Sequence, residues 1–144
     1  TRAIRTPLLN AIMYNRGGLS RAERELGATG ASVVNHCIYC TAVHSSRYNQ
    51  LTRSEDVMAE IFAHEEAAKL GPRDQAIFDF AVKLSRTPSE ATPEDIARLR
   101  KAGLDEAEIL DLILSSALFG WANRLMHTLG EPLLPDDEAA PARP

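Results

Sequence analysis

The sequence of 144 residues lacks the usual marks of a β-protein, a membrane span or a disulfide scaffold. Valine (5) and isoleucine (8) are few beside alanine (21) and leucine (17), which favours helices over strands. Polar residues interrupt the most apolar segment, Ile109 to Leu125, so we expect no membrane span. The only two cysteines, Cys37 and Cys40, are too close in sequence to join distant parts of a fold.

Charge and length limit the kind of partner, the compartment and the number of domains that we expect. The 16 basic and 20 acidic residues give a net charge of −4 and form no dense basic block, so we expect no nucleic-acid partner. No basic and apolar export signal follows Thr1, and we therefore expect a cytoplasmic, reducing environment. The length fits one domain, over residues 1–130, followed by an acidic, proline-rich tail over 131–144.

Helix signals recur along the whole chain. Capping boxes are expected at Ser20-x-x-Glu23, Thr52-x-x-Glu55 and Asp105-x-x-Glu108, and Thr92-Pro93-Glu94-Asp95 and Gly71-Pro72 open two further helices. We expect helices over about 7–14, 20–35, 37–51, 52–70, 72–84, 92–103 and 105–129. The sequence therefore predicts an all-α fold, a single compact helical domain of about six to seven helices. The last helix, apolar around most of its circumference, is expected to lie at the centre of the core.

Two glycines interrupt the helix predicted over 20–35. Gly27 and Gly30 each cost about 1 kcal/mol relative to alanine inside a helix. Their neighbours Ala28, Ala31 and Ser32 are also small. We interpret this stretch as a close crossing with another helix.

The residues most suited to chemistry lie between Glu25 and His44, in the pattern Glu25-x11-Cys37-x2-Cys40-x3-His44. At about 100° per residue, the two cysteines and the histidine fall within an arc of roughly 60° on one helix face. Cys37 would lie in the first turn, where unpaired backbone N–H groups favour a thiolate. Glu25 would reach this face from the preceding helix.

These residue types fit thiol chemistry. An imidazole can take the proton of a neighbouring thiol, and a carboxylate can orient that imidazole. A second cysteine one turn away can capture a sulfenic acid as a disulfide. The pattern therefore suits a two-cysteine peroxidase or a dithiol–disulfide exchanger.

Two other interpretations of the cysteines stay open. They could simply be small helix residues. With His44 they could also bind zinc, the fourth ligand being Glu25, His36, His64 or His127. A thioredoxin-like domain is not indicated, because its strands are missing.

The pattern resembles the signature of the alkylhydroperoxidase D-like proteins, within the carboxymuconolactone decarboxylase superfamily. Three motifs carry the resemblance to the peroxidase-related branch: Arg24-Glu25, Asn35-x-Cys37-x-Tyr39-Cys40 and the late segment Ala117-Leu118-Phe119-Gly120-Trp121-Ala122-Asn123-Arg124. The similarity extends over about 19–129. It implies an alkylhydroperoxidase D-like helical fold and a thiol-dependent, antioxidant peroxidase.

The resemblance assigns a role to each site residue. Cys40 would be the peroxidatic cysteine and Cys37 the resolving one, with His44 and Glu25 as the proton relay. The helix-terminus argument favours Cys37 as the more acidic thiol, but His44 neighbours Cys40, so we assign the attack to Cys40. Tyr39 stands where alkylhydroperoxidase D has a further histidine, and tyrosine is a poor proton shuttle at neutral pH.

The resemblance also implies partners. A hydroperoxide would be the substrate, and an external dithiol, carried by a lipoyl-bearing protein or another carrier, would be the reductant. No resident cofactor or metal is expected, and the chain would form a homo-oligomer, a trimer or hexamer. The competing hypothesis is a non-enzymatic helical module that senses redox state or binds zinc.

Aromatic and polar residues of the last helix are given less specific roles. Phe119 and Trp121 are expected in the core or in a subunit interface, from where they could also line an apolar approach to the cysteines. His127 is expected to complement the helix C-terminus. Asn123 and Arg124 are expected to make surface or interhelical contacts, and neither is named catalytic.

Overall fold

The computed structural model describes the backbone of residues 2–130 and the side chains of residues 6–130, and these form helices without strands. The elements are α1 (Arg2–Met13), α2 (Arg21–Val34), α3 (Ile38–Thr52), α4 (Asp56–His64), the 3₁₀ turn η1 (Glu65–Ala67), α5 (Pro72–Ser85), α6 (Pro93–Lys101) and α7 (Glu106–Leu129). The all-α prediction is confirmed for this part of the chain. The tail predicted over 131–144 lies outside the described residues.

Most helix starts follow the predicted capping chemistry. Ser20, Thr92 and Asp105 are N-caps whose side chains pair with the third helical residue in capping boxes. Pro72 occupies the first position of α5, where its missing N–H costs nothing. The helix starts predicted at 20, 92 and 105 therefore coincide with the observed N-caps.

The capping box predicted at Thr52 is wrong. Thr52 is the last residue of α3, and its hydroxyl donates to the carbonyl of Tyr48 at 3.0 Å instead of capping the next helix. The hydroxyl of Ser54 accepts the Asp56 N–H at 3.2 Å as α4 begins. The helix predicted over 52–70 is also shorter, since α4 ends at His64.

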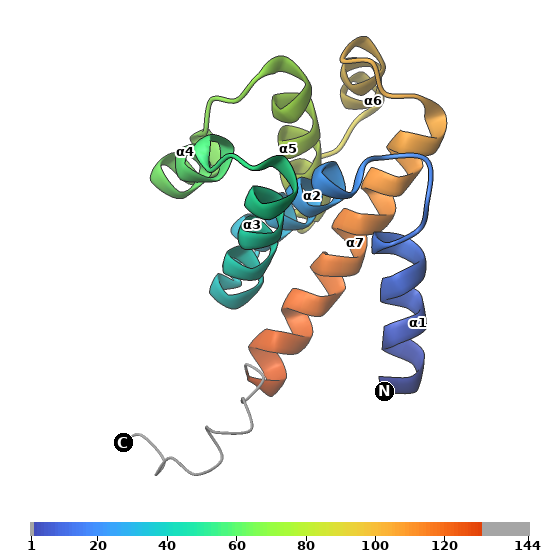
Figure 1. Cartoon of the computed structure of the whole chain (residues 1–144), viewed down its shortest axis with the longest axis vertical. Coiled ribbons are helices and arrows are strands. Elements are labelled where there is room, and N and C mark those ends of the chain that lie inside the picture. The colour runs from blue at the N-terminus through green and yellow to red at the C-terminus, as the bar shows by residue number, and fades with distance from the viewer. Residues whose placement is uncertain (1, 131–144) are drawn as a thin grey trace.

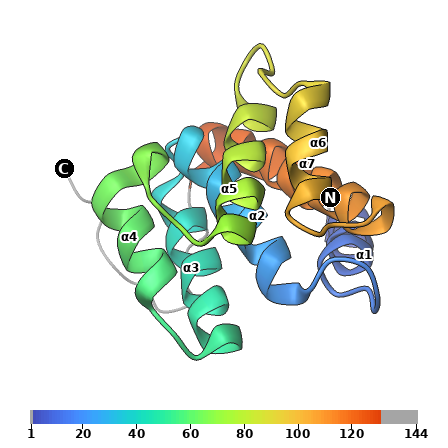
Figure 2. The same cartoon turned by 90° about the horizontal axis from the view of Figure 1, so that it is seen from above.

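Helix α2, not α7, lies at the centre of the molecule (Figures 1 and 2). It packs against α3, α5 and α7, and every residue from Arg24 to Ser32 is buried. A glycine pair permits this close packing. A Cβ on Gly27 would lie 2.7 Å from a Leu112 methyl of α7, and a Cβ on Gly30 would lie 3.0 Å from the Ala81 Cβ of α5. The predicted close crossing is confirmed.

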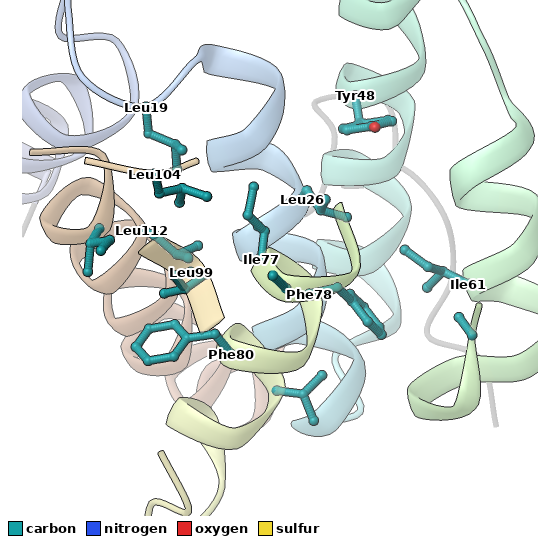
Figure 3. Packing of buried hydrophobic residues seen from close by; sticks show 14 of the residues in the cluster. Leu19, Leu26, Tyr48, Ile61, Ile77, Phe78, Phe80, Leu99, Leu104 and Leu112 are labelled. Atoms are coloured by element: carbon teal, nitrogen blue, oxygen red, sulfur yellow. The ribbon is translucent and has the colours of Figure 1, made fainter. Parts of the chain in front are cut away.

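The main hydrophobic core lies between α2, α5, α6 and α7 and extends to α3 and α4 (Figure 3). Leu26, Ile77, Phe78, Leu99 and Leu112 are fully buried at its centre. A second, smaller cluster joins α1 to α2 and α7 through Met13, Ala28, Ala31, Leu118 and Phe119. Helix α2 thus separates two apolar clusters and carries polar residues between them.

Helix α7 leaves an apolar side exposed, contrary to the prediction that it is the central helix. The exposed large residues on it are Leu110, Leu114, Trp121, Leu125 and Leu129. By length and composition α7 could cross a membrane, although Asp111 interrupts it, and it is the one helix of the described residues to pass that test. The core helix of a protein passes the same test. In α7, 44% of the apolar window is buried inside the protein.

Candidate active site

The turn from α2 to α3 places Cys37 at the boundary of both helices. Backbone N–H groups of His36 and Cys37 donate to the carbonyls of Val33 and Ser32, each at 2.9 Å, in the Schellman pattern that ends many helices. His36 adopts the left-handed conformation (φ 53°) that this pattern requires, a position where glycine is usual. The last hydrogen bond of the α2 C-terminus is therefore the one that the Cys37 N–H donates.

Cys37 is the N-cap of α3 and not a residue of its first turn, which corrects the sequence prediction. Its φ and ψ of −90° and 89° are not helical, so the angular spacing does not apply to it. Its side chain makes no capping hydrogen bond, and its carbonyl accepts the Thr41 N–H at 2.9 Å. Cys37 therefore lies at the positive end of α3, as the argument for a thiolate requires.

Glu25 and His44 form the buried centre of the site. The Nδ1 of His44 lies 2.5 Å from Glu25 Oε2, and both side chains are withdrawn from solvent. Burial by itself would raise the pKa of Glu25, but hydrogen bonds and charge from His44 and Arg21 lower it below its ordinary value of 4.5. Glu25 is therefore ionised at neutral pH and accepts the Nδ1–H. In the neutral ring, Nε2 then keeps its lone pair for accepting a proton.

Arg21 supports Glu25 from the solvent side and was not predicted. Its Nε donates to Glu25 Oε1 at 2.9 Å, and its Nη2 contacts the same oxygen. The guanidinium lies over the ring of Tyr14, 3.7 Å from the ring centre. The two oxygens of Glu25 are thus divided between Arg21 and His44. The i, i+4 spacing of Arg21 and Glu25 is the sequence signal that could have indicated this pair.

Cys40 and His44 occupy consecutive turns of α3 and are both buried. The ring of Phe119 from α7 packs edge-on against His44, with 3.9 Å between ring centres. Cys37 and Cys40 are 4% and 6% exposed. Tyr39, by contrast, is 40% exposed, as expected for a residue directed away from the cysteine face. The four predicted site residues therefore come from α2, the α2–α3 turn and α3, with Phe119 as an apolar wall.

Arg24, the neighbour of Glu25, is buried equally well but serves the fold. Its guanidinium donates to the carbonyls of Ile12, Asn15 and Gly17 at 2.7–3.1 Å and to Asp111 Oδ2 at 2.7 Å. These bonds tie the end of α1 and the following loop to α2 and α7. These partners of Arg24 are three backbone carbonyls and one carboxylate, and none belongs to the site around Glu25 and His44.

The other histidines lie outside this cluster. His127 lies in the last turn of α7, as predicted. It is also hydrogen bonded to the backbone carbonyl of Asn35, at 2.7 Å. His64 is exposed and lies 3.5 Å from Glu60. Asn123 is fully buried and hydrogen bonded with Ser32 at 3.2 Å, an interhelical contact as predicted. Within the described residues, no three His, Cys, Asp or Glu side chains are grouped to hold a metal ion.

The chain is thus a small helical protein that combines a Cys-x-x-Cys pair at the start of α3 with a buried carboxylate–imidazole pair. The model of the carboxymuconolactone decarboxylase family matches residues 2–83, more than half of the sequence. The chain belongs to this family. The resemblance inferred from the motifs is confirmed.

Relatives agree with this assignment. A peroxidase-related protein of uncharacterised function from Silicibacter sp. TM1040 superposes with a TM-score of 0.81 at 26% identity, over 95% of this chain and 72% of that one. A second, from Ralstonia eutropha JMP134 and described as an alkylhydroperoxidase AhpD core, gives a TM-score of 0.78 at 28% identity, over 88% of this chain and 66% of that one. The uncharacterised protein YdfG of Bacillus subtilis is 23% identical over 115 residues, 80% of this chain and 78% of its own length. The fold is alkylhydroperoxidase D-like.

Proposed function

We propose that the protein is a thiol-dependent hydroperoxide reductase in which Cys40 attacks the peroxide. The contact between Glu25 Oε2 and His44 Nδ1, 2.5 Å long and buried, carries this proposal. It leaves Nε2 of His44 as the proton acceptor one helical turn from Cys40. The family supplies the precedent, since its solved relatives include proteins described as peroxidase-related.

The reaction balances with these groups. His44 takes the Cys40 proton, and the thiolate attacks the O–O bond of a hydroperoxide to give a sulfenic acid and an alkoxide. The alkoxide leaves as an alcohol after receiving a proton from the imidazolium. The thiol of Cys37 then displaces hydroxide from the sulfenic acid, so that a disulfide and water form. The hydroperoxide gains the two electrons that the two thiols lose.

An external dithiol would return the disulfide to two thiols, and we propose a lipoyl-bearing protein or a similar carrier in this role. The cycle needs no resident cofactor or metal. The proposed relay consists of Glu25 and His44, and Tyr39, whose side chain is 40% exposed, is not part of it. We further propose a cytoplasmic homo-oligomer, a trimer or hexamer, and the exposed apolar residues of α7 support the assembly. A light-scattering mass equal to one chain would contradict it.

Intact mass before and after one equivalent of tert-butyl hydroperoxide tests the thiol cycle. The wild type is expected to lose about 2 Da as the disulfide forms. The Cys40→Ser variant is expected to consume no hydroperoxide, whereas Cys37→Ser is expected to gain one oxygen that dimedone captures. Turnover with excess dithiol then separates an enzyme from a sensor, which would oxidise once and stop. An unchanged mass and a bound zinc ion in the native protein would replace the proposal with a metal-binding module.

A further inference from the structure

The contact between Phe119 and His44 joins α7 to α3, two helices that both pack against α2. The centres of the two rings lie 3.9 Å apart, and the ring planes are inclined at 68°. Aromatic pairs in proteins usually have their ring centres about 4.5–7 Å apart, so this contact is tight even for the smaller imidazole ring. Both side chains are buried. The edge contact therefore limits how far the imidazole ring can turn.

The smaller hydrophobic cluster holds Phe119 in its place. Four other buried side chains, from α1, α2 and α7, make up this cluster with it: Met13, Ala28, Ala31 and Leu118. Protein interiors are packed as densely as organic crystals, so a large ring enclosed in this way has little space into which it could move. Phe119 therefore presents a fixed surface to His44.

The plane of the His44 ring is not determined by the helix backbone. The χ2 torsion of histidine joins an sp³ carbon to an sp² carbon, so its preference is broad and roughly two-fold. The hydrogen bond from Nδ1 to Glu25 Oε2 restrains one side of the ring. A hydrogen bond weakens steeply only below about 120°, so this bond by itself leaves the ring plane partly free. The edge contact with Phe119 supplies a second restraint, from a different helix.

We propose that Phe119 is a positioning residue of the proton relay, which fixes the plane of the His44 ring and thereby the direction of the Nε2 lone pair. The inference rests on the proposed function, in which His44 takes the proton of Cys40. In that transfer the S–H bond breaks, its electron pair stays on sulfur, and an N–H bond forms at Nε2. The lone pair lies in the ring plane, so a turned ring misdirects it even while Glu25 keeps its hydrogen bond. Glu25 thus selects the tautomer of His44, and Phe119 selects the orientation of the ring.

Phe119→Leu tests this role, because leucine keeps the cluster apolar but has no flat ring. Phe80→Leu is the matched control, since the same substitution there removes a buried ring that belongs to the main core. Stopped-flow oxidation by tert-butyl hydroperoxide, corrected for the folded fraction, should be about tenfold slower in Phe119→Leu than in wild type, because small misplacements of a reacting group are costly. Phe80→Leu should change the rate by less than about twofold. Phe119→Met, which fills more of the space of the ring, takes the place of Phe119→Leu if that variant does not fold.

Carbon-13 relaxation of the His44 ring gives a second readout, which a loss of stability alone would not move and which needs no hydroperoxide. The order parameter of the ring should be lower in reduced Phe119→Leu than in wild type and unchanged in Phe80→Leu. An unchanged order parameter or an unchanged oxidation rate in Phe119→Leu would overturn the inference, and so would an equal loss of rate in Phe80→Leu. A wild type that hydroperoxide does not oxidise would instead contradict the proposed function, and the order parameters would then decide whether Phe119 orients His44.

Discussion

Arg24 and Glu25 are consecutive residues of α2, both almost fully buried, yet they serve different purposes. The two terminal nitrogens of Arg24 donate to three backbone carbonyls and to the carboxylate of Asp111. Glu25 faces a titratable ring, His44, on one oxygen and Arg21 on the other. Because a helix turns by 100° per residue, neighbouring side chains point to different partners.

Burial of a charge therefore does not by itself identify a catalytic residue. Arg24 donates to backbone carbonyls and to a carboxylate of α7, so its bonds hold parts of the fold together. Glu25 meets an imidazole that is one turn from a cysteine, so its charge can affect a proton transfer. Three substitutions and one change of pH test this contrast.

The largest effect is expected for Glu25→Gln. The amide is nearly isosteric but cannot supply the negative charge that orients and stabilises His44, so the rate of oxidation by hydroperoxide should fall by about 10² to 10⁴. Stopped-flow kinetics with tert-butyl hydroperoxide measure this rate. Glu94→Gln, at an exposed position of α6, is the control. An unchanged rate would remove Glu25 from the relay.

Arg24→Met should produce the opposite result. The substitution removes the Arg24 donors to three carbonyls and to Asp111 Oδ2, which keeps the Leu19 N–H. Removal of one partner of a buried pair costs about 3–5 kcal/mol of unfolding free energy. The rate per folded molecule should stay within about threefold of wild type, because none of the bonds of Arg24 reaches the site. Urea unfolding and the same kinetics measure both quantities, with the exposed Arg16→Met as control. A large loss of rate without a loss of unfolding free energy would contradict the purely structural role of Arg24.

Acid should weaken the fold partly through Glu25. Its pKa is lower in the folded protein than its ordinary value of 4.5, so its contribution to stability is complete above that value and is lost as the pH falls through the folded pKa. Urea unfolding between pH 7 and pH 3 should therefore show a steeper fall for wild type than for Glu25→Gln. Parallel curves would contradict the lowered pKa. Glu23 and Asp95, whose pKa values are also lowered, are present in both proteins and cancel in the comparison.

The smallest effect is expected for Arg21→Gln. Arg21 helps to lower the pKa of Glu25, so its removal should move the Glu25 titration upwards, towards 4.5. The pair is partly exposed, so unfolding free energy should change by less than about 1 kcal/mol. Carbon-13 NMR of the Glu25 carboxyl measures the titration, and Arg16→Gln is the control. A titration that does not move would show that His44 alone determines the pKa of Glu25.

The sequence predicts the helices well where local chemistry decides. Capping at Ser20 and Asp105 depends on residues three apart, so it is visible without any tertiary information. At Thr52 the same pattern is misleading because the hydroxyl has a competing acceptor, the carbonyl of Tyr48, within its own helix. The prediction that α7 is the central helix rests on its apolar composition. Composition cannot tell a face buried in the core from one that is left exposed.

Of the predicted site, the structure shows the contact between Glu25 and His44 directly. The spacing and the family resemblance add Cys40 and Cys37 to them, and the catalytic roles of all four residues stay predictions. The contact of Phe119 with His44 depends on how α7 crosses α3, which no local pattern encodes. The exact place of Cys37 depends on a helix ending in which His36 occupies a position usually taken by glycine, and helical periodicity cannot anticipate it.

That ending has a mechanical consequence. The amide of Cys37 closes one helix and its carbonyl opens the next, so its backbone is fixed from both sides and only rotation about the Cα–Cβ bond is left to its sulfur. A sulfur–sulfur bond to Cys40 must then be accommodated by the first turn of α3 and not by the connecting loop. We expect the amide of Thr41, which is bonded to that carbonyl, to exchange hydrogen at different rates in the oxidised and reduced proteins. The corner between two helices would thus report the redox state of the dithiol through its backbone.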